Sequence, residues 1–357
     1  MRIVVESLTL KSALSDVMRV QDSRATMPIL EDVLLKVTDG RLTLTCSSRE
    51  LWATVDVETK EADRGAACVD ARSLFTGVSN IVGLLTIETI GKEFIVSYQN
   101  GRFSLPLDDE DLYPDMPKER DARVFVLDAA EVSAGMVRAM PAMAKNDTLR
   151  TYLNSVYFDF TGEQLNIVGT SGFALVISPI RFNSDVCSFI LAAKAVTVLN
   201  VFLAKVRDVR IAFDSQNIFA SGDGFSFIAC KVDGKYPNYM SVVPADYATS
   251  YKVNGKTLRD AVRRVGVFSE ERTNRVLMSF DYNTLKLSCE NIDYNKRSEE
   301  RISIVGSERK GICLKSTILT ELLPDEDVTM FVESADRAMV FKYNGVTVLI
   351  MPIQMVV

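Results

Sequence analysis

The side chains best suited to catalysis are either missing from this sequence or scattered along it. Histidine is absent from the 357 residues, which excludes Ser-His-Asp and Cys-His nucleophilic sites, histidine-ligated metals and histidine general bases. The six cysteines form no C-x-x-C pair, and we expect buried, reduced thiols rather than a zinc site. They are Cys46, Cys68, Cys187, Cys230, Cys289 and Cys313. This distribution argues against an enzyme.

One acidic segment, DDEDLYPD at 108–115, has the oxygen ligands that a hard metal ion prefers. Asp108, Asp109 and Asp111 therefore support one alternative, a β-rich enzyme whose carboxylates hold a metal. It predicts metal-dependent turnover that Asp→Asn substitutions abolish. We favour a solvated connector between two domains, because the polar stretch KERDA (118–122) follows directly.

The elements that would position any site are organised as a repeat. RFSLPLDDEDLYPDMP (102–117) and SFIACKVDGKYPNYMSVVP (226–244) share a strand, an Asp, a Tyr-Pro pair and a closing Pro, and Tyr113 and Tyr236 lie 123 positions apart. Each third also opens with a short apolar strand that leads into an amphipathic helix, at 3–20, 124–140 and 251–268. A period of about 120 residues is domain-sized rather than that of a solenoid repeat. We expect three domains, at 1–120, 121–245 and 246–357.

Within each third, short β-rich runs alternate with two helical stretches. Consecutive short strands favour antiparallel sheets with the helices packed on one side, which is an α+β fold. The predicted helices are 8–20, 70–82, 129–145, 192–205, 256–268 and 314–323. No apolar run approaches the ~20 residues that span a bilayer, and the N-terminus lacks the apolar core of a signal peptide, so we expect a cytoplasmic protein.

Charge is distributed unevenly between the helices and the rest of the chain. The six helical stretches hold twelve basic and five acidic side chains, a net charge of +7. Because the whole chain has a net charge of −6, the strands and loops together carry −13. Such a split allows one surface to attract phosphate while the remainder repels it. The sequence shows neither a recognition helix nor an aromatic stacking platform, so nucleic-acid binding should be directed at the backbone and sensitive to salt.

The chain resembles the bacterial DNA polymerase III β sliding clamps over its full length. The resemblance is carried by five stretches in order: RATMPILEDVLLKV (24–37), RFSLPLDDEDLYPDMP (102–117), LRTYLNSVYF (149–158), KVDGKYPNYMSVVP (231–244) and VLIMPIQ (348–354). It implies a processivity factor with no cofactor, in which two chains join head to tail into a ring around duplex DNA. Helices would line the hole and sheets would lie outside.

The resemblance also implies a pocket between domains two and three. It would accept short Q-L-x-L-F-like peptides from the polymerase α subunit, the clamp loader and repair proteins, and an apolar groove with adaptable Met and Ile side chains suits varied ligands. The implied pocket residues are Arg150, Tyr152, Leu153, Thr170, Gly172, Leu175, Pro237, Val242, Leu349, Ile350, Met351, Pro352 and Ile353.

The chain departs from the family pattern around this pocket. Ala174, preceded by Phe173, stands where the family usually has a basic residue, Ser241 replaces an Arg and Thr273 replaces an aromatic residue. Val356 and Val357 continue beyond the usual end. We therefore expect an altered peptide preference.

The ring and DNA contacts follow from the same resemblance. Phe103 and Leu105 on an edge strand of domain one would face Val267 and Phe268 of the other chain, because an exposed apolar edge needs a partner. Arg102 and Glu299, or Glu300, would form an ion pair at the rim. The residues expected to face DNA are Arg24, Lys194, Arg19, Arg72 and Arg138.

A third alternative is a structural ring or tube that does not bind DNA. It predicts no loss of function when the Lys and Arg side chains of the helices are neutralised. The clamp interpretation predicts DNA, a second copy of the chain and replication proteins as partners, without a membrane, in the cytoplasm at the nucleoid.

Overall fold

The computed structural model describes residues 1–22, 27–306 and 308–353. Six α-helices lie in these residues, each inside or close to one of the predicted stretches, so these six predictions are confirmed. The helices are α1 (Ser7–Val17), α2 (Ala71–Val78), α3 (Ala129–Ala139), α4 (Ala193–Leu203), α5 (Gly255–Gly266) and α6 (Ser316–Leu322). None of the described helices is long and apolar enough to cross a membrane.

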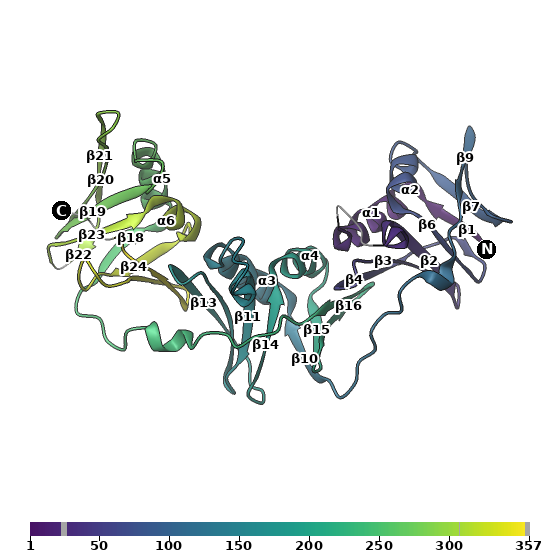
Figure 1. Cartoon of the computed structure of the whole chain (residues 1–357), viewed down its shortest axis with the longest axis horizontal. Coiled ribbons are helices and arrows are strands. Elements are labelled where there is room, and N and C mark those ends of the chain that lie inside the picture. The colour runs from purple at the N-terminus through teal and green to yellow at the C-terminus, as the bar shows by residue number, and fades with distance from the viewer. Residues whose placement is uncertain (23–26, 307, 354–357) are drawn as a thin grey trace. The chain divides into compact units, whose positions relative to one another are not determined.

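The chain repeats one unit, a strand followed by a helix and three more strands, six times (Figure 1). In every unit the first strand ends at the residue before the helix begins. These leading strands are β1 (Arg2–Glu6), β6 (Gly65–Asp70), β10 (Arg123–Asp128), β14 (Cys187–Ala192), β18 (Tyr251–Asn254) and β23 (Lys310–Lys315). Two of these units make up each third of the chain, so every sequence repeat of about 120 residues contains two copies of the same structural unit.

The three strands that follow each helix form an antiparallel meander. In chain order they are β2 (Asp32–Thr38), β3 (Arg41–Ser47), β4 (Leu51–Val57); β7 (Leu84–Ile90), β8 (Glu93–Tyr98), β9 (Gly101–Pro106); β11 (Ser155–Phe160), β12 (Gln164–Thr170), β13 (Ala174–Arg181); β15 (Asp208–Phe213), β16 (Asn217–Gly222), β17 (Phe225–Cys230); β19 (Arg275–Asp281), β20 (Thr284–Asn291), β21 (Lys296–Ser303); β24 (Asp327–Phe331), β25 (Met339–Tyr343) and β26 (Val346–Ile350). Two short strands, β5 (Glu61–Ala62) and β22 (Val305–Gly306), are additional.

The chain forms two compact units, the first of residues 1–133 and 194–231 and the second of residues 134–193 and 232–357. The first unit contains a sheet of order β5-β1-β7-β8-β9 and an eight-stranded sheet of order β10-β15-β16-β17-β4-β3-β2-β6. The second contains a nine-stranded sheet of order β14-β11-β12-β13-β26-β25-β24-β18-β22 and a sheet of order β21-β20-β19-β23. The central third therefore contributes strands to both units.

Apolar spacing explains why the helices form and which side they bury. In α5, Leu258, Ala261, Val262 and Val265 are buried at helical spacing against core residues of the neighbouring sheets. Asn254 caps this helix by accepting a hydrogen bond from the Thr257 N–H at 3.0 Å. In the same way α1 packs against α2 and against β3 and β4. The opposite helix faces remain exposed and carry most of the helical charge.

A buried carboxyl group lies at the start of β2. Asp32 is 4% exposed, and the Cys68 thiol donates a hydrogen bond to its Oδ2 at 3.4 Å. Burial, together with the neighbouring charge of Asp108, raises the pKa of Asp32 from 3.8 to about 7. Asp108 is itself fixed here, because its N–H donates to the Cys68 carbonyl at 3.0 Å.

Replacing Asp32 should change how stability depends on pH. Between pH 4 and about 7 the folded state holds a proton that the unfolded state has released, so the free energy of unfolding falls as pH rises across this interval. Asp32→Asn removes the titrating group and should make the protein more stable than wild type at pH 8, with a flatter profile in urea denaturation.

The control is Asp39→Asn, in a turn whose φ of 52° an Asn tolerates. This substitution should leave the wild-type pH profile unchanged. An Asp32→Asn profile with the wild-type slope between pH 4 and 7 would contradict the assignment.

Candidate peptide-binding site

A cavity of about 220 Å³ lies within the second compact unit, where the nine-stranded sheet passes from β13 to β26. Its walls come from the 3₁₀ turns Thr151–Asn154 and Tyr239–Val242, the loop between β12 and β13, and the end of β26. The lining residues are Arg150, Tyr152, Leu153, Thr170, Gly172, Phe173, Ala174, Leu175, Pro237, Asn238, Tyr239, Val242, Ala338, Leu349 and Met351. The walls are mainly apolar, with a few polar groups at the mouth.

Strand pairing sets which side chains face the cavity. Leu175 on β13 lies directly opposite Leu349 on β26, and both lie in one buried cluster with Tyr236 and Tyr239. Their neighbours in the ladder, Ala174 and Ile350, are also paired. Adjacent residues of a strand point to opposite faces, so Ile350 belongs to the core on the other side of the sheet and is 0% exposed.

The loop between β12 and β13 is held by its own hydrogen bonds. The Thr170 hydroxyl donates to the Ala174 carbonyl at 2.6 Å and accepts from the Gly172 N–H at 3.1 Å. Gly172 has φ +85°, a conformation that side chains rarely adopt, and a Gly there lets the loop close. The Met351 N–H donates to the Phe173 carbonyl at 2.8 Å, while the Phe173 side chain is 68% exposed at the cavity mouth.

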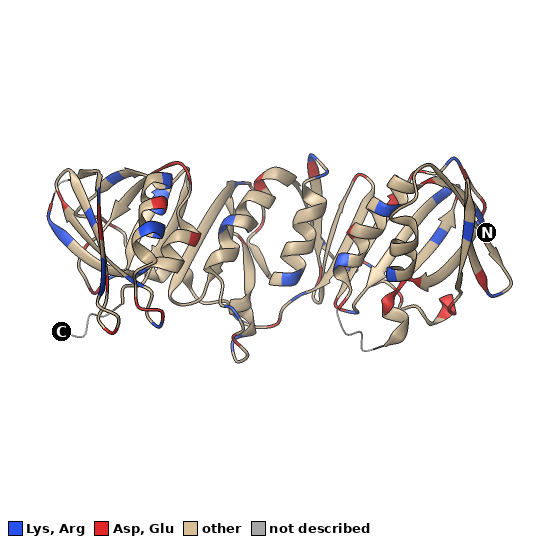
Figure 2. Cartoon of the chain, turned by 90° about the horizontal axis from the view of Figure 1, so that it is seen from above, with Lys and Arg blue, Asp and Glu red and all other residues tan. Residues whose placement is uncertain are grey.

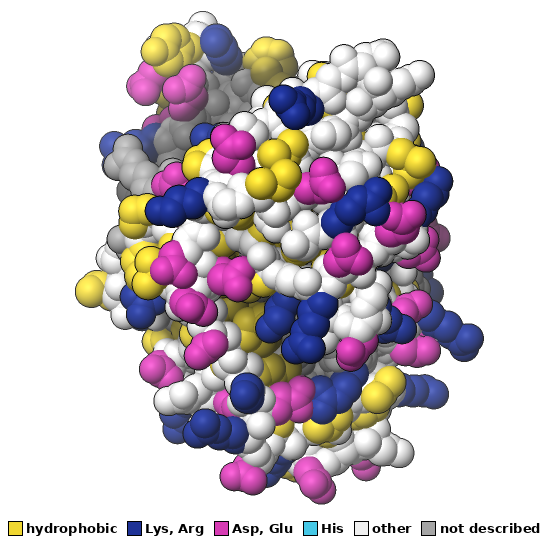
Figure 3. Space-filling model, turned by 90° about the vertical axis from the view of Figure 1, so that its right-hand side faces the viewer, with side chains coloured by type: hydrophobic (Ala, Val, Ile, Leu, Met, Phe, Trp, Pro, Cys, Tyr) yellow, Lys and Arg dark blue, Asp and Glu magenta, His cyan; other side chains and the backbone are white. Residues whose placement is uncertain are grey.

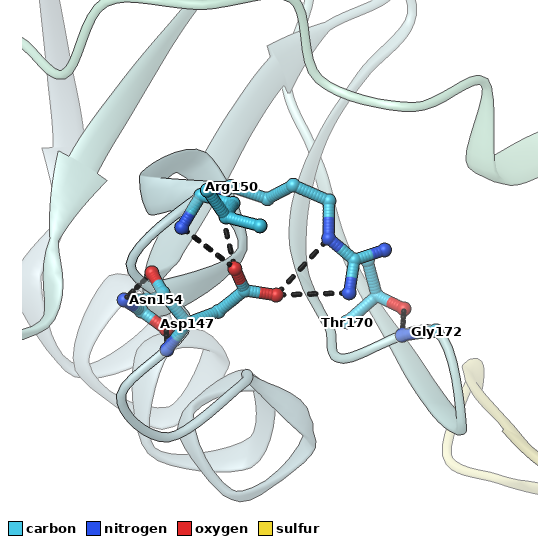
Figure 4. Close-up of polar contacts among 6 residues, drawn as sticks. Asp147, Arg150, Asn154, Thr170 and Gly172 are labelled. Atoms are coloured by element: carbon cyan, nitrogen blue, oxygen red, sulfur yellow. Dashed lines mark hydrogen bonds and ion pairs between the residues drawn. The ribbon is translucent and has the colours of Figure 1, made fainter.

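A carboxylate fixes the one guanidinium at the mouth (Figure 4). Asp147 Oδ2 accepts from Arg150 Nη2 at 2.8 Å and from Nε at 3.0 Å, and its Oδ1 accepts from the N–H groups of Arg150 and Leu149. Asn154 in turn donates to the Asp147 carbonyl at 2.8 Å. The hydrogen bonds from the Arg150 backbone and side chain hold the pKa of Asp147 below its ordinary value. Arg150 is thereby oriented before any ligand arrives.

Aromatic residues pack in the same buried cluster as Leu175 and Leu349 of the cavity wall. The Tyr157 and Tyr236 rings stack with centroids 4.5 Å apart. The Tyr239 hydroxyl donates to Asp159 Oδ2 at 2.6 Å and accepts from Asn166 at 3.0 Å. These contacts anchor the turn Tyr239–Val242, so Val242 is presented at the mouth, where it is 59% exposed.

Ten of the thirteen predicted pocket residues line this cavity, and three do not. Ile350 lies outside the cavity because it is buried in the core on the other face of the sheet. Pro352 and Ile353 follow the strand and are half-buried elsewhere, where the Ile353 N–H donates to the Cys313 carbonyl at 2.8 Å. The cavity is also lined by Asn238, Tyr239 and Ala338, which the sequence did not indicate, and by Phe173 and Ala174, which were named only as departures from the family pattern. Asp147, which holds Arg150, was not predicted either.

The residues predicted for ring closure lie on two edge strands and directly after α5. β9 ends the sheet β5-β1-β7-β8-β9, and β21 ends the sheet β21-β20-β19-β23. Phe103 and Leu105 on β9 are half-exposed, and Figure 3 shows hydrophobic side chains among charged ones on the end of the chain that carries β9. Val267 and Phe268, directly after α5, are 77% and 40% exposed.

The two acids predicted for the rim ion pair already have partners within their own chain. Glu299 lies 2.6 Å from Lys286, and Glu300 lies 2.6 Å from Arg264. Arg102 is exposed on β9. An ion pair of Arg102 with either acid across a ring interface therefore requires it to compete with Lys286 or Arg264.

The basic residues predicted to face DNA differ in how far their charge is available. Arg19 and Arg72 are exposed on or directly after helices, whereas Arg138 is half-buried and donates to the Ser178 hydroxyl at 3.4 Å. Lys194 donates to the Val20 carbonyl at 2.7 Å and pairs with Asp22. Arg24 lies outside the described residues. Figure 2 shows Lys and Arg on helices in each part of the chain.

The acidic segment proposed for a metal has another arrangement. The Asp109 side chain accepts from the Asp111 N–H at 3.2 Å, and Asp108 lies beside Asp32. Among residues 1–22, 27–306 and 308–353, no group of three or more His, Cys, Asp or Glu residues is placed to hold a metal ion.

Together, the sixfold repeat and the continuous antiparallel sheets define an α+β scaffold of three similar domains, with an apolar cavity in its second compact unit. Models of the N-terminal, central and C-terminal domains of the DNA polymerase III beta subunit match residues 1–117, 128–238 and 240–323. The chain belongs to this family, the sliding clamps of DNA replication, whose members are processivity factors and not enzymes.

Individual relatives agree with this assignment. The chain is 28% identical to the beta sliding clamp of Escherichia coli K12 over 305 residues, covering 84% of this chain and 83% of that protein. A Pseudomonas aeruginosa sliding clamp, solved with griselimycin bound, superposes with a TM-score of 0.95 at 23% identity over 99% of this chain and 100% of the other. The beta subunit of Thermotoga maritima gives a TM-score of 0.90 at 18% identity, with 99% of each chain covered.

Asp147→Ala should loosen the cavity mouth in a way that Arg150→Ala does not. The first substitution removes the acceptor for the Leu149 and Arg150 N–H groups, whereas the second removes only the side-chain ion pair. In amide hydrogen exchange, Asp147→Ala should therefore speed exchange at both amides by about tenfold or more. Arg150→Ala should keep Leu149 protected. Equal protection in the two variants would contradict this role for Asp147.

Proposed function

We propose that this sliding clamp closes head to tail with a second copy around duplex DNA and holds its partners by short peptides in the cavity beside Leu175 and Leu349. The partners are the replicative polymerase, the clamp loader and repair proteins, with Q-L-x-L-F-like segments. The observation that carries the proposal is the cavity itself, because ten residues implied by the family resemblance line it. The domains would be 1–120, 121–245 and 246–357, and the protein would act in the cytoplasm at the nucleoid.

The chemistry of the cavity supports a peptide ligand. Leu153, Leu175 and Leu349 line the cavity with apolar side chains. A Leu or Phe side chain of a peptide that enters the cavity is removed from water, and this burial favours binding. Met351 adapts to different shapes. Arg150, held by Asp147, supplies a charged donor for a peptide carbonyl or carboxylate at the mouth.

The open strand edges support ring closure. Unpaired edges that carry apolar side chains are prone to aggregation unless a partner covers them. β9 is such an edge, β21 ends its sheet with mostly polar side chains, and Val267 with Phe268 adds exposed apolar surface after α5. Pairing β9 of one chain with β21 of another would satisfy both edges and bring Phe103 and Leu105 towards that surface.

The charge pattern supports contact with DNA that is weak and not sequence-specific. Arg19, Arg72, Lys256 and Arg263 lie on or next to helices and have no ion pair among the described residues. Phosphate contacts from such side chains weaken as salt rises. Enclosure in a ring makes high affinity unnecessary, since a tethered polymerase rebinds at high effective concentration.

Val242→Asp should weaken peptide binding without unfolding the protein. Val242 is 59% exposed at the cavity mouth, so the substitution is tolerated in the free protein, but a bound apolar side chain would bury the new charge. Fluorescence anisotropy with labelled QLSLF should show at least about tenfold weaker binding. Val82→Asp, at an 84% exposed position outside the cavity, is the control and should bind as wild type does. Equal affinity of the two variants would reject the cavity as the site.

Substituting both Val267 and Phe268 by Asp should prevent ring closure. Wild type should sediment at twice the mass of one chain, and the double variant at the mass of one, because the charges would face an apolar edge. Val305→Asp, at a 68% exposed position on β22, should stay dimeric. A monomeric wild type at micromolar concentration would exclude the closed ring.

Ring closure also predicts a topological difference in DNA retention. After loading, wild type should stay on nicked circular DNA and slide off linear DNA of the same length, since only the circle lacks ends. The open variant should leave both at the same rate. Equal loss of wild type from the two DNAs would count against encirclement.

A further inference from the structure

A second hollow of about 430 Å³ adjoins the proposed peptide cavity within the same compact unit. The two share three wall residues, Val242, Ala338 and Met351. The remaining walls come from the connector 243–249 and from the segment between β24 and β25. A chain that leaves the peptide cavity past Val242 and Met351 therefore enters the second hollow directly.

The floor of the second hollow is aromatic. The Tyr247 and Phe331 rings lie with centroids 4.2 Å apart, and the Lys342 ammonium lies 4.6 Å from the Tyr247 centroid. The Tyr247 hydroxyl is buried and has no hydrogen-bond partner among the described residues. The two rings offer the hollow an apolar surface.

The rim of the second hollow is acidic. Asp246, Glu333 and Asp336 are exposed there, opposed by the single guanidinium of Arg337, which pairs with Glu333 at 2.7 Å. The Ser334 hydroxyl donates to Asp336 at 2.6 Å and helps to hold the pKa of that carboxyl below its ordinary value. Asp246 and Asp336 have no ion pair among the described residues, and with Glu333 these acids outnumber Arg337 and Lys342, which favours a cationic side chain.

We propose that the second hollow binds the residues flanking the core motif of the same partner peptides, and that it selects an apolar side chain next to a Lys or Arg. The inference rests on the proposed function of the first cavity. Continuity supports it, because an unrelated ligand in the second hollow would contact the Val242 and Met351 walls that the core peptide needs. The aromatic floor would take the apolar side chain, and Asp246 and Asp336 would pair with the basic one.

The test compares three labelled peptides on the full chain by fluorescence anisotropy. They are the core QLSLF, the N-terminal extension LKSQLSLF and the C-terminal extension QLSLFSLK. The hollow lies on one side of the cavity, so one extension should bind about tenfold tighter than the core and the other should bind like the core. Replacing Lys by Glu in the tighter peptide should abolish the gain.

Two variants locate the gain. Ala248→Trp fills the second hollow from an exposed position, and Asp336→Asn removes a rim charge; neither residue lines the first cavity. Both should leave the affinity for QLSLF unchanged. Ala248→Trp should remove the gain from the extension, and Asp336→Asn should reduce it.

The outcomes separate this inference from the proposed function. Failure of QLSLF to bind wild type would overturn the proposed function. If QLSLF binds but neither extension binds more tightly, or if the gain survives Ala248→Trp, the second hollow is not the flanking site and the inference is wrong. A gain that both Lys→Glu and Ala248→Trp cancel supports it.

Discussion

The structure depends on the pairing of strand edges between repeats that are distant in the sequence, the first with the fourth and the third with the sixth. β4 pairs with β17 from Phe225 opposite Val55 to Ala229 opposite Leu51, and β13 pairs with β26 from Ala174 to Ile177. These ladders convert what would be exposed edges into continuous sheets of eight and nine strands. The second ladder also builds the cavity, because its register sets Leu175 opposite Leu349. The second and third predicted domains are thus joined by the β13–β26 ladder as well as by their linker. The cavity is therefore built on a sheet and not on loops alone.

Much of the fold could be predicted from the sequence, and the missing parts have physical reasons. Apolar spacing gave correct predictions of helices such as α5, and the short β-rich runs correctly indicated antiparallel sheets. β21 was not predicted, because its sequence KRSEERIS is polar on both faces and its side chains form ion pairs instead of a core. β6, β14 and β23, which lead the second unit of each third, were not predicted, although β1, β10 and β18 run into their helices in the same way.

The site could be predicted in part, for reasons that differ between residues. Leu349 lines the cavity, as the family resemblance implies for the pocket, whereas the period of two along a strand places Ile350 on the other face of the sheet. Ala338 and Asp147 could not be found from a pattern. Ala338 reaches the cavity only through the β25–β26 hairpin, and Asp147 acts through hydrogen bonds that begin outside the cavity. Phe173 was noted only as preceding a departure from the family, although its exposed ring lies at the mouth.

The ion pairs of the helices bear on how a clamp can move. Lys194, Arg259 and Arg264 are paired with carboxylates that lie outside the six predicted helical stretches, so less positive charge is free than the net count of +7 indicates. Each free phosphate contact steepens the salt dependence and the cost of leaving a position on DNA. A ring that encloses DNA stays on it without tight phosphate contacts, and such contacts would slow its movement along the DNA. Partial neutralisation therefore suits sliding: enough charge remains to favour DNA over protein surfaces, and too little remains to hold the ring at one place.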